Sequence, residues 1–217
     1  KVVDTAAYGW TLIGHPEWAP DQSRFAVTVG VPPGVRTEIV SLSFSSSPII
    51  VTARGGLNID PAWSLDGKYI YFAGCPNPAS CTVNDLSIMR ADAATGFLTP
   101  PEPVANSPLA DYDPMPNPDG STIAWLSQHE LPSVDFPAGL WHVRVGSGGA
   151  GRIVTPLDEP AINSRPAWAD SRTVVYHRVR YRTPATRFSI WMTDIVSGHT
   201  VPVTDPYANY VVEFPDV

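Results

Sequence analysis

The stretch DPAWSLDGKYIYFAG, residues 60–74, combines a tryptophan, an Asp-Gly turn and an aromatic and aliphatic run. Asp-Gly favours a tight hairpin turn, and the run after it has the composition of a β-strand. The same layout recurs in three other stretches: HPEWAPDQSRFAVTVG (15–30), DPMPNPDGSTIAWLS (113–127) and RPAWADSRTVVYHR (165–178). A chain that repeats itself at this scale is expected to form stacked copies of one supersecondary unit.

Each copy can be aligned on its tryptophan and on the aspartate of the following turn. The tryptophan position is occupied by Trp18, Trp63, Pro116, Trp168 and Glu213. The turn aspartates are Asp21, Asp66, Asp119 and Asp216, with Ser171 in the fourth copy. A short carboxylate there accepts backbone N–H groups of the turn. We expect the tryptophans to pack between units, because buried aromatic rings dominate such contacts.

Each copy continues with a third and a fourth β-type segment, and no segment has a sustained helical period. Four short strands in a unit of roughly 45 residues are typical of a β-propeller blade. The sequence therefore predicts an all-β propeller of four-stranded antiparallel blades. The expected boundaries are four complete blades at about 14–57, 58–110, 111–162 and 163–207, with partial blades at 1–13 and 208–217.

The two ends of the chain suggest a larger ring. VDTAAYGWTL near the N-terminus aligns with RADAATGFLT of the second copy, which places Gly9 on Gly96 and Trp10 on Phe97. At the other end, YVVEFPDV has the composition of another first strand. An open propeller would leave sheet edges exposed. We therefore expect the chain to be part of a longer propeller or to be completed by another polypeptide.

The second copy resembles the TolB-like propeller repeat, a variant of the WD repeat found in TolB and in prolyl-oligopeptidase-type and tricorn proteases. The residues that carry this resemblance are Pro61, Trp63, Ser64, Asp66, Gly67, Ile70 and Phe72. The resemblance implies the fold and, by analogy with TolB-like propellers, a role as an interaction scaffold. In the protease families, it implies that catalysis belongs to a separate hydrolase domain.

Composition narrows the function classes and the compartment. A net charge of −7 argues against general nucleic-acid binding, and no apolar stretch is long enough to span a membrane. The chain begins at Lys1 without a signal peptide, which we read as a mature form or a piece of a longer protein. The only cysteines, Cys75 and Cys81, lie in one Pro-rich stretch, and we expect them to form a disulfide. That bond favours a periplasmic or extracellular location over a cytosolic loop with two thiols.

The expected binding surface is the face on which the second and third strands of each blade are connected. The longest connections fall there, and insertions on one face of a repeat protein usually mark its binding face. The blades also begin on this face, with Asp60, Asp113 and Arg165 near the channel. An arginine-rich segment of the fourth copy is a candidate docking loop for an acidic partner, against the alternative of a solvated face; its residues are Arg178, Arg180, Tyr181, Arg182 and Arg187.

Motifs for catalysis and for metals are absent from the sequence. No nucleophile elbow, zinc-protease motif, phosphate loop or dinucleotide fingerprint occurs. Oxygen atoms around the channel could bind Ca²⁺, but a solvated polar rim without a cofactor is the favoured interpretation; the residues concerned are Asn58, Asp60, Asp111, Asp113 and Asn163.

The leading hypothesis is therefore a non-catalytic extracytoplasmic scaffold that binds another protein. The alternatives are the gating propeller of a larger prolyl-oligopeptidase-like hydrolase, and a carbohydrate-binding propeller.

Overall fold

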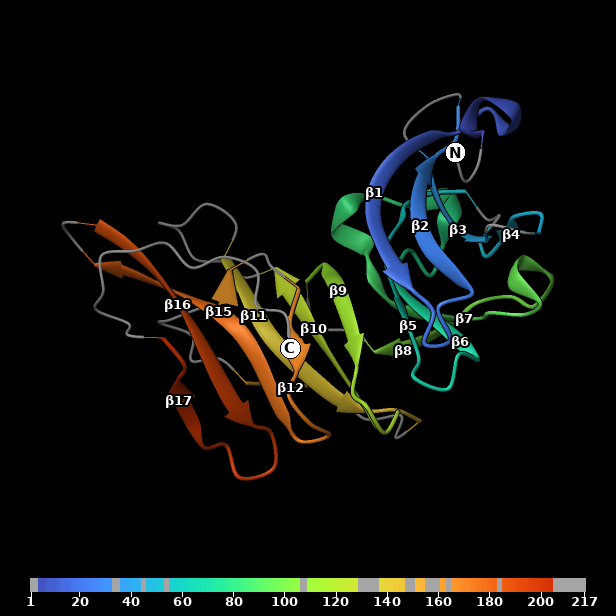
Figure 1. Ribbon diagram of the computed structural model, residues 1–217. Helices are drawn as coiled ribbons and strands as arrows, with labels where there is room; N and C mark the ends of the chain where they lie inside the picture. The colour runs from blue at the N-terminus through green and yellow to red at the C-terminus, as the bar shows by residue number, and fades with distance from the viewer. Residues whose placement is uncertain are drawn as a thin grey trace.

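The computed structural model describes residues 4–32, 36–43, 46–52, 55–105, 109–128, 137–146, 151–154, 161–162, 165–182 and 185–204. It is an all-β structure whose sheets are arranged as a fan (Figure 1). Within these ranges the helical elements are four short 3₁₀ turns: η1 (Thr5–Tyr8), η2 (Pro78–Ser80), η3 (Val83–Asp85) and η4 (Gly96–Leu98). No described helix has the length and apolar character needed to cross a membrane.

The first two repeat units form separate antiparallel sheets, each with its strands in sequence order. Unit 1 comprises β1 (Thr11–Trp18), β2 (Arg24–Gly30), β3 (Thr37–Ser43) and β4 (Ile49–Ile50). Unit 2 comprises β5 (Asn58–Trp63), β6 (Tyr69–Gly74), β7 (Ser87–Asp92) and β8 (Glu102–Ala105). The predicted four-stranded antiparallel units are confirmed here.

The third and fourth units share one nine-stranded sheet, which the sequence did not predict. Unit 3 comprises β9 (Asp111–Pro116), β10 (Thr122–Gln128), β11 (Pro137–Arg144) and β12 (Arg152–Ile153). Unit 4 comprises β14 (Ala167–Trp168), β15 (Thr173–Arg182), β16 (Ala185–Asp194) and β17 (Thr200–Pro202). The short strand β13 (Ala161–Ile162) pairs with β11 at Pro137 and Ala138 and with β15 at Arg178, and so joins the two units.

The N-terminal boundary of unit 1 also differs from the expected one. Thr11 and Leu12 pair with Gly30 and Val29 of β2, so the first sheet begins before residue 14. The pairing of β1 with β2 continues on both sides of an irregularity around Gly14, where the register shifts between Leu12 and Gly14 and again between Gly14 and Glu17. Gly9 and Gly96, aligned from the sequence, both have positive φ, at 66° and 55°. The expected partial blade at 208–217 lies outside the described residues.

Tryptophans tie successive units together. Trp63 is 8% exposed, and its Nε1 donates to the Glu17 carbonyl of unit 1 at 3.0 Å. Trp168 is also 8% exposed, and its Nε1 donates to the Met115 carbonyl of unit 3 at 2.8 Å. These two packing predictions are confirmed. Trp18 is different: it is 51% exposed and lies beside Phe25.

The hydrophobic core is divided among the seams between units. One buried cluster contains Ala26 and Ile39 of unit 1 with Trp63 and Phe72 of unit 2. Between units 2 and 3, where Pro116 replaces the tryptophan, Tyr71 and Ile88 pack with Ile123 and Trp125. The stacking of successive units therefore buries apolar side chains at each seam, as expected for repeat architectures.

The turn aspartates behave as predicted. Asp21, Asp66 and Asp119 each accept a backbone N–H from the residue two positions later, at 2.8–3.1 Å. In the fourth copy Asp170 takes this role, accepting from Arg172 and Thr173 at 2.7 Å, although the alignment had placed Ser171 there. Hydrogen bonds lower the pKa of all four carboxyls. The largest contribution comes from the backbone for Asp21 and Asp170, and from the hydroxyl groups of Ser64 and Ser121 for Asp66 and Asp119.

Candidate functional site

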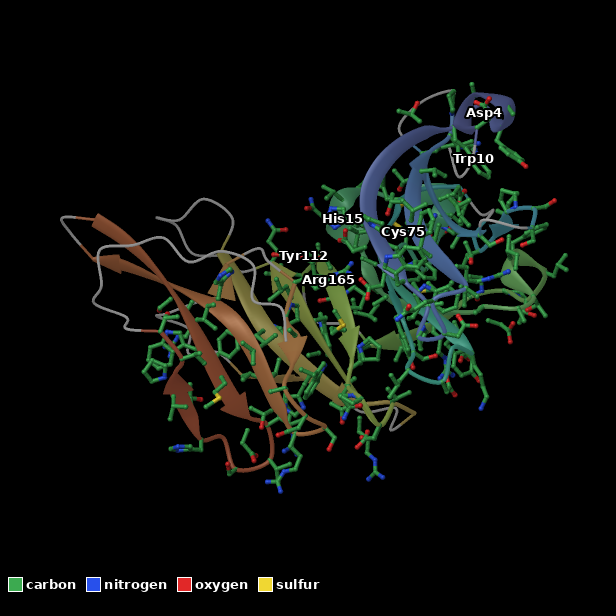
Figure 2. The ribbon with its side chains drawn as sticks, in the orientation of Figure 1. Asp4, Trp10, His15, Cys75, Tyr112 and Arg165 are labelled. Carbon is green, nitrogen blue, oxygen red and sulfur yellow. A yellow bond between two sulfur atoms is a disulfide. The ribbon has the colours of Figure 1, made fainter. Side chains whose placement is uncertain are left out.

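Four residues that precede a proline occupy equivalent places on the first strands of the four units. His15 lies on β1, Asp60 on β5 and Asp113 on β9, and Arg165 stands just before β14. We call these four residues the pre-proline cluster. Figure 2 shows His15 and Arg165 facing the region between the two halves of the molecule, near Tyr112.

The backbone explains why these side chains converge. His15, Asp60 and Asp113 have positive φ values of 56°, 56° and 51°, which is rare for residues other than glycine. The pairing of each first strand with its neighbour is irregular at the same place, between Gly14 and Glu17, Ile59 and Ala62, and Tyr112 and Met115 in the three units. An irregularity of this kind bends a strand and redirects its side chains. Each left-handed residue costs about 1–3 kcal/mol, a strain that is found most often at functional sites.

Charged groups from all four units contact one another in this cluster. His15 Nδ1 lies 3.4 Å from an Asp60 carboxylate oxygen. Arg165 reaches three units at once: Nη1 lies 2.7 Å from the Glu17 carboxylate, Nη2 donates to the Pro61 carbonyl at 3.1 Å, and Nε lies 3.8 Å from Asp113. Three carboxylates therefore face one permanent cation.

Burial makes the two aspartates unusual. The Asp60 and Asp113 side chains are each 9% exposed. Burial and the neighbouring Asp60 carboxylate raise the pKa of Asp113 from 3.8 to about 7. Burial also raises the pKa of Asp60, although His15, Arg165 and the backbone N–H of Asp113 oppose that shift. The pKa of Tyr112 is raised by burial and by the nearby aspartates.

Other polar residues at the start of the units are already committed to structural contacts. The buried Asp111 accepts from Trp125 Nε1 at 2.9 Å. The Asn58 amide donates to the Thr37 carbonyl and to Glu38, at 2.9 and 3.2 Å. Asp60 and Asp113 belong to the pre-proline cluster. The fifth residue of the oxygen-ligand set, Asn163, lies outside the described residues.

The arginine-rich segment is not a loop. Residues 178–182 belong to β15 and 185–187 to β16, and Arg180 pairs with Arg187 across the hairpin. The alternation of Val, Tyr and Arg in this segment suits a strand, and the antiparallel pairing continues through it. Arg178 is 6% exposed, with its guanidinium 4.2 Å from the centre of the Trp191 ring. A buried arginine stacked on tryptophan is a packing element, so the surface docking role predicted for Arg178 is not retained.

The other residues of the predicted arginine-rich segment lie on the same two strands. Arg180, Tyr181 and Arg182 lie on β15, and Arg187 lies on β16. Their proposed contact with an acidic partner stays a prediction. Arg172, which borders the segment, has its own intrachain partner, since Nη2 lies 2.9 Å from the Asp194 carboxylate.

The cysteine prediction is confirmed. Cys75 and Cys81 form a disulfide, with their Cα atoms 5.6 Å apart. The bond closes the connection between β6 and β7, which also contains η2 and η3. This connection leaves the sheet at Gly74, directly opposite Asn58, where β5 begins. We call this side of the molecule, where the first strands begin and the second strands end, the entry face.

Two clefts lie on the side opposite the entry face, beside the turns that follow the first strands. One, of about 510 Å³, is lined by residues of units 1 and 2 that include Arg24, Trp63 and Leu65. The second, of about 380 Å³, is lined by residues of units 2 and 3 that include Leu65, Arg90 and Pro118. Neither contains a member of the pre-proline cluster.

No family model and no curated protein sequence matches the chain. Solved structures do resemble it. TolB of Acinetobacter baumannii aligns with a TM-score of 0.64 and 18% identity over 90% of this chain and 44% of that protein. An oligogalacturonate lyase in complex with manganese aligns with a TM-score of 0.64 and 17% identity, over 90% of this chain and 54% of the lyase. A puromycin-hydrolysing peptidase of Mycobacterium tuberculosis aligns with a TM-score of 0.61 and 17% identity, over 91% of this chain and 30% of the peptidase.

These similarities establish the fold: the chain has the architecture of a TolB-like β-propeller. They agree with the resemblance found in the repeat centred on Trp63. The chain spans between 30% and 54% of the length of these three proteins. The three differ in what they are named to do, so the fold by itself does not select one activity.

Proposed function

We propose that this protein is a non-catalytic, extracytoplasmic interaction scaffold that binds a partner protein through its entry face. The observation that carries the proposal is the convergence of His15, Asp60, Asp113 and Arg165 from four units. A stacked repeat needs no charged side chains at this position to fold. Burying charged groups lowers the stability of the fold, and buried charges that are present despite this cost are typical of binding sites.

The entry face has the properties of a docking surface. The disulfide-closed β6–β7 connection stands beside the start of β5 and displays Val83, which is 61% exposed. A covalently closed connection loses less conformational freedom when it is bound, which favours affinity. The disulfide also supports a periplasmic or extracellular location, since such bonds persist in oxidising compartments.

The electrostatics favour a partner with a basic or polar segment at the centre of the contact. Glu17, Asp60 and Asp113 outnumber Arg165, whose guanidinium is already held by Glu17 and the Pro61 carbonyl. Without a bound cation, the cluster offers a polyanionic sugar chain little free positive charge, because the Arg165 guanidinium is already engaged.

The proposal also concerns the number of blades in the complete propeller. We infer that the units described here are four blades of a larger ring, flanked by the partial blades expected at its ends. The greater length of the three similar proteins supports this inference. The intact mass of the natural protein tests it: a mass equal to 23.4 kDa would contradict a longer chain.

A second candidate function follows from one of those similarities. The peptidase of Mycobacterium tuberculosis has a region of the same fold, so this chain is a candidate for the propeller portion of a larger hydrolase. A hydrolase domain in the full-length protein, with peptidase activity, would favour this candidate over the scaffold.

The interaction proposal is tested with a matched pair of surface variants. Val83 on the entry face and Leu65 in the β5–β6 turn on the opposite side are 61% and 59% exposed. Each is replaced by arginine, and the wild type and both variants are used to capture partners from a cell-envelope extract of the source organism, with quantification by mass spectrometry. Val83→Arg should reduce the recovery of a specific partner at least tenfold, while Leu65→Arg should leave it unchanged. Loss of binding with Leu65→Arg alone would place the partner at the clefts, and equal recovery with all three proteins would exclude the entry face.

A further inference from the structure

Three nitrogen and oxygen atoms of the pre-proline cluster are positioned like the ligands of a metal ion. One ligand atom each from His15, Asp60 and Asp113 lies within 4.8 Å of the other two. Bonds of about 2.0–2.2 Å to a shared ion place such atoms roughly 3–4 Å apart. His15 Nδ1 and the Asp60 carboxylate oxygen, 3.4 Å apart, already lie within that range, and the His15 side chain is 56% exposed.

The cations near the two buried carboxylates are held at long distances or by other groups. His15 Nδ1 lies 3.4 Å from Asp60. For Asp113, the nearest cation among the described residues is Arg165 Nε at 3.8 Å, beyond hydrogen-bond distance. Arg165 instead directs Nη1 to Glu17 at 2.7 Å. The Asp60 and Asp113 side chains are each 9% exposed, and one oxygen atom of each lies within 4.8 Å of the other. Two buried carboxylates this close together are unfavourable unless a cation or a proton lies between them.

The repeat geometry makes this arrangement independent of any single loop. Each of the three residues lies at the irregular point of a first strand, and the strands β1, β5 and β9 contact in series. A site held on strands is positioned more accurately than one held on loops. The guanidinium of the fourth member, Arg165, lies next to Glu17 and Asp113. Because a guanidinium has no free electron pair to donate, Arg165 is not a ligand.

We propose that His15, Asp60 and Asp113 bind one divalent transition-metal ion of the Mn²⁺ or Zn²⁺ class. An imidazole nitrogen with two carboxylates is a ligand set that these ions accept, whereas Mg²⁺ and Ca²⁺ prefer oxygen ligands only. Three protein ligands leave further coordination positions, and the exposure of His15 places them on the solvent side. The inference goes beyond the partner-binding proposal and does not depend on it.

The test is metal binding to the purified protein after dialysis against a chelator. Mn²⁺ binding is followed by electron paramagnetic resonance and Zn²⁺ binding by calorimetry, with thermal unfolding to verify that each variant is folded. We expect one saturable site per chain. Asp113→Asn and His15→Ala should each weaken binding at least tenfold, because each removes one ligand of three.

Two further variants distinguish a metal site from general charge attraction. Asp66→Asn removes an exposed turn carboxylate on the opposite side and should leave the affinity unchanged. Arg165→Gln removes the competing cation and should tighten binding severalfold. The proposal is overturned if the wild type shows no saturable binding, if Asp113→Asn binds as tightly as the wild type, or if Ca²⁺ binds at this site and is not displaced by Mn²⁺ or Zn²⁺.

Discussion

Replacement of Trp63 by alanine should destabilise the protein by about 4–5 kcal/mol. Truncating a buried tryptophan generally costs about 3–5 kcal/mol through lost apolar contact and a residual cavity. Trp63 is 8% exposed and packs with Ile39 of unit 1 and Phe72 of unit 2. Its Nε1 also donates to the Glu17 carbonyl at 3.0 Å, a bond that contributes about 1 kcal/mol. The expected value therefore lies at the upper end of the range.

Two further variants separate the contributions. Trp63→Phe keeps most of the aromatic packing but loses the donor to Glu17, so it should cost about 1–2 kcal/mol. Trp18→Ala affects the equivalent residue of unit 1, which is 51% exposed, and should cost no more than about 2 kcal/mol. The difference between the two alanine variants measures the packing of one unit on another.

Equilibrium urea denaturation, followed by far-ultraviolet circular dichroism, gives the free energy of unfolding for all three variants and the wild type. The linear dependence on urea must have the same slope in each, because a changed slope indicates a changed unfolded or native state. If Trp63→Ala costs less than about 1 kcal/mol, or no more than Trp18→Ala, the tryptophan does not join units 1 and 2 and the repeat frame is wrong.

Three other perturbations have defined outcomes. Reduction of the Cys75–Cys81 disulfide should lower the unfolding free energy by about 2–3 kcal/mol, measured by denaturation with and without reductant; two thiols detected in the untreated protein would contradict the bond. Gly96→Ala should lower the unfolding free energy by at least about 2 kcal/mol, because φ is +55° and a Cβ would lie 2.3 Å from the Ile50 carbonyl oxygen. Gly67→Ala, where φ is +70° and no atom lies within 4 Å of the added Cβ, should cost about 1 kcal/mol. The third perturbation is pH, with a chelator present. Asp113 has a pKa of about 7 in the folded protein and near 3.8 in the unfolded chain, so the folded state binds the proton more tightly. The unfolding free energy should therefore fall by roughly 2–4 kcal/mol as the pH rises from 4 to 8. Asp113→Asn should flatten that dependence, and an unchanged pH profile would show that Asp113 does not retain its proton.

The sequence predicted those features that depend on local chemistry repeated in several copies. Asp66 and Asp119 stabilise the turns because a short carboxylate reaches the N–H two residues on, whatever surrounds it. Trp63 and Trp168 occupy the same seam position because equal units stack in the same way. The disulfide follows from two cysteines near each other in one connection.

Features that depend on pairing between units were not visible in the sequence. The strand β13 is only two residues long, yet it joins units 3 and 4 through both β11 and β15. The arginine segment reads as a loop from the sequence because it holds the extra residues between the second and third strands of its copy, but it continues β15, and Arg178 is buried against Trp191. Buried Glu38, which accepts from the Gly55 N–H at 2.9 Å and from Asn58, also carried no sequence signal.

The candidate site was predicted in part. Asp60, Asp113 and Arg165 were expected near the inner end of the units, but His15 was not included. The four residues differ in type, so an alignment by residue identity does not connect them. The shared signal is the proline that follows each one: Pro16, Pro61, Pro114 and Pro166. Only the structure shows that this position bends the strand and brings the side chains together.

Site-specific photocrosslinking in living cells tests the central claim, that the entry face binds the partner, most directly. A benzophenone-bearing amino acid is incorporated in place of Val83 in one strain and Leu65 in another, since both positions are well exposed and lie at opposite ends of unit 2. Illumination should produce one defined adduct with a partner protein from position 83 and none from position 65. An adduct from position 65 alone, or none from position 83 when the protein is expressed at its natural level, would contradict the account.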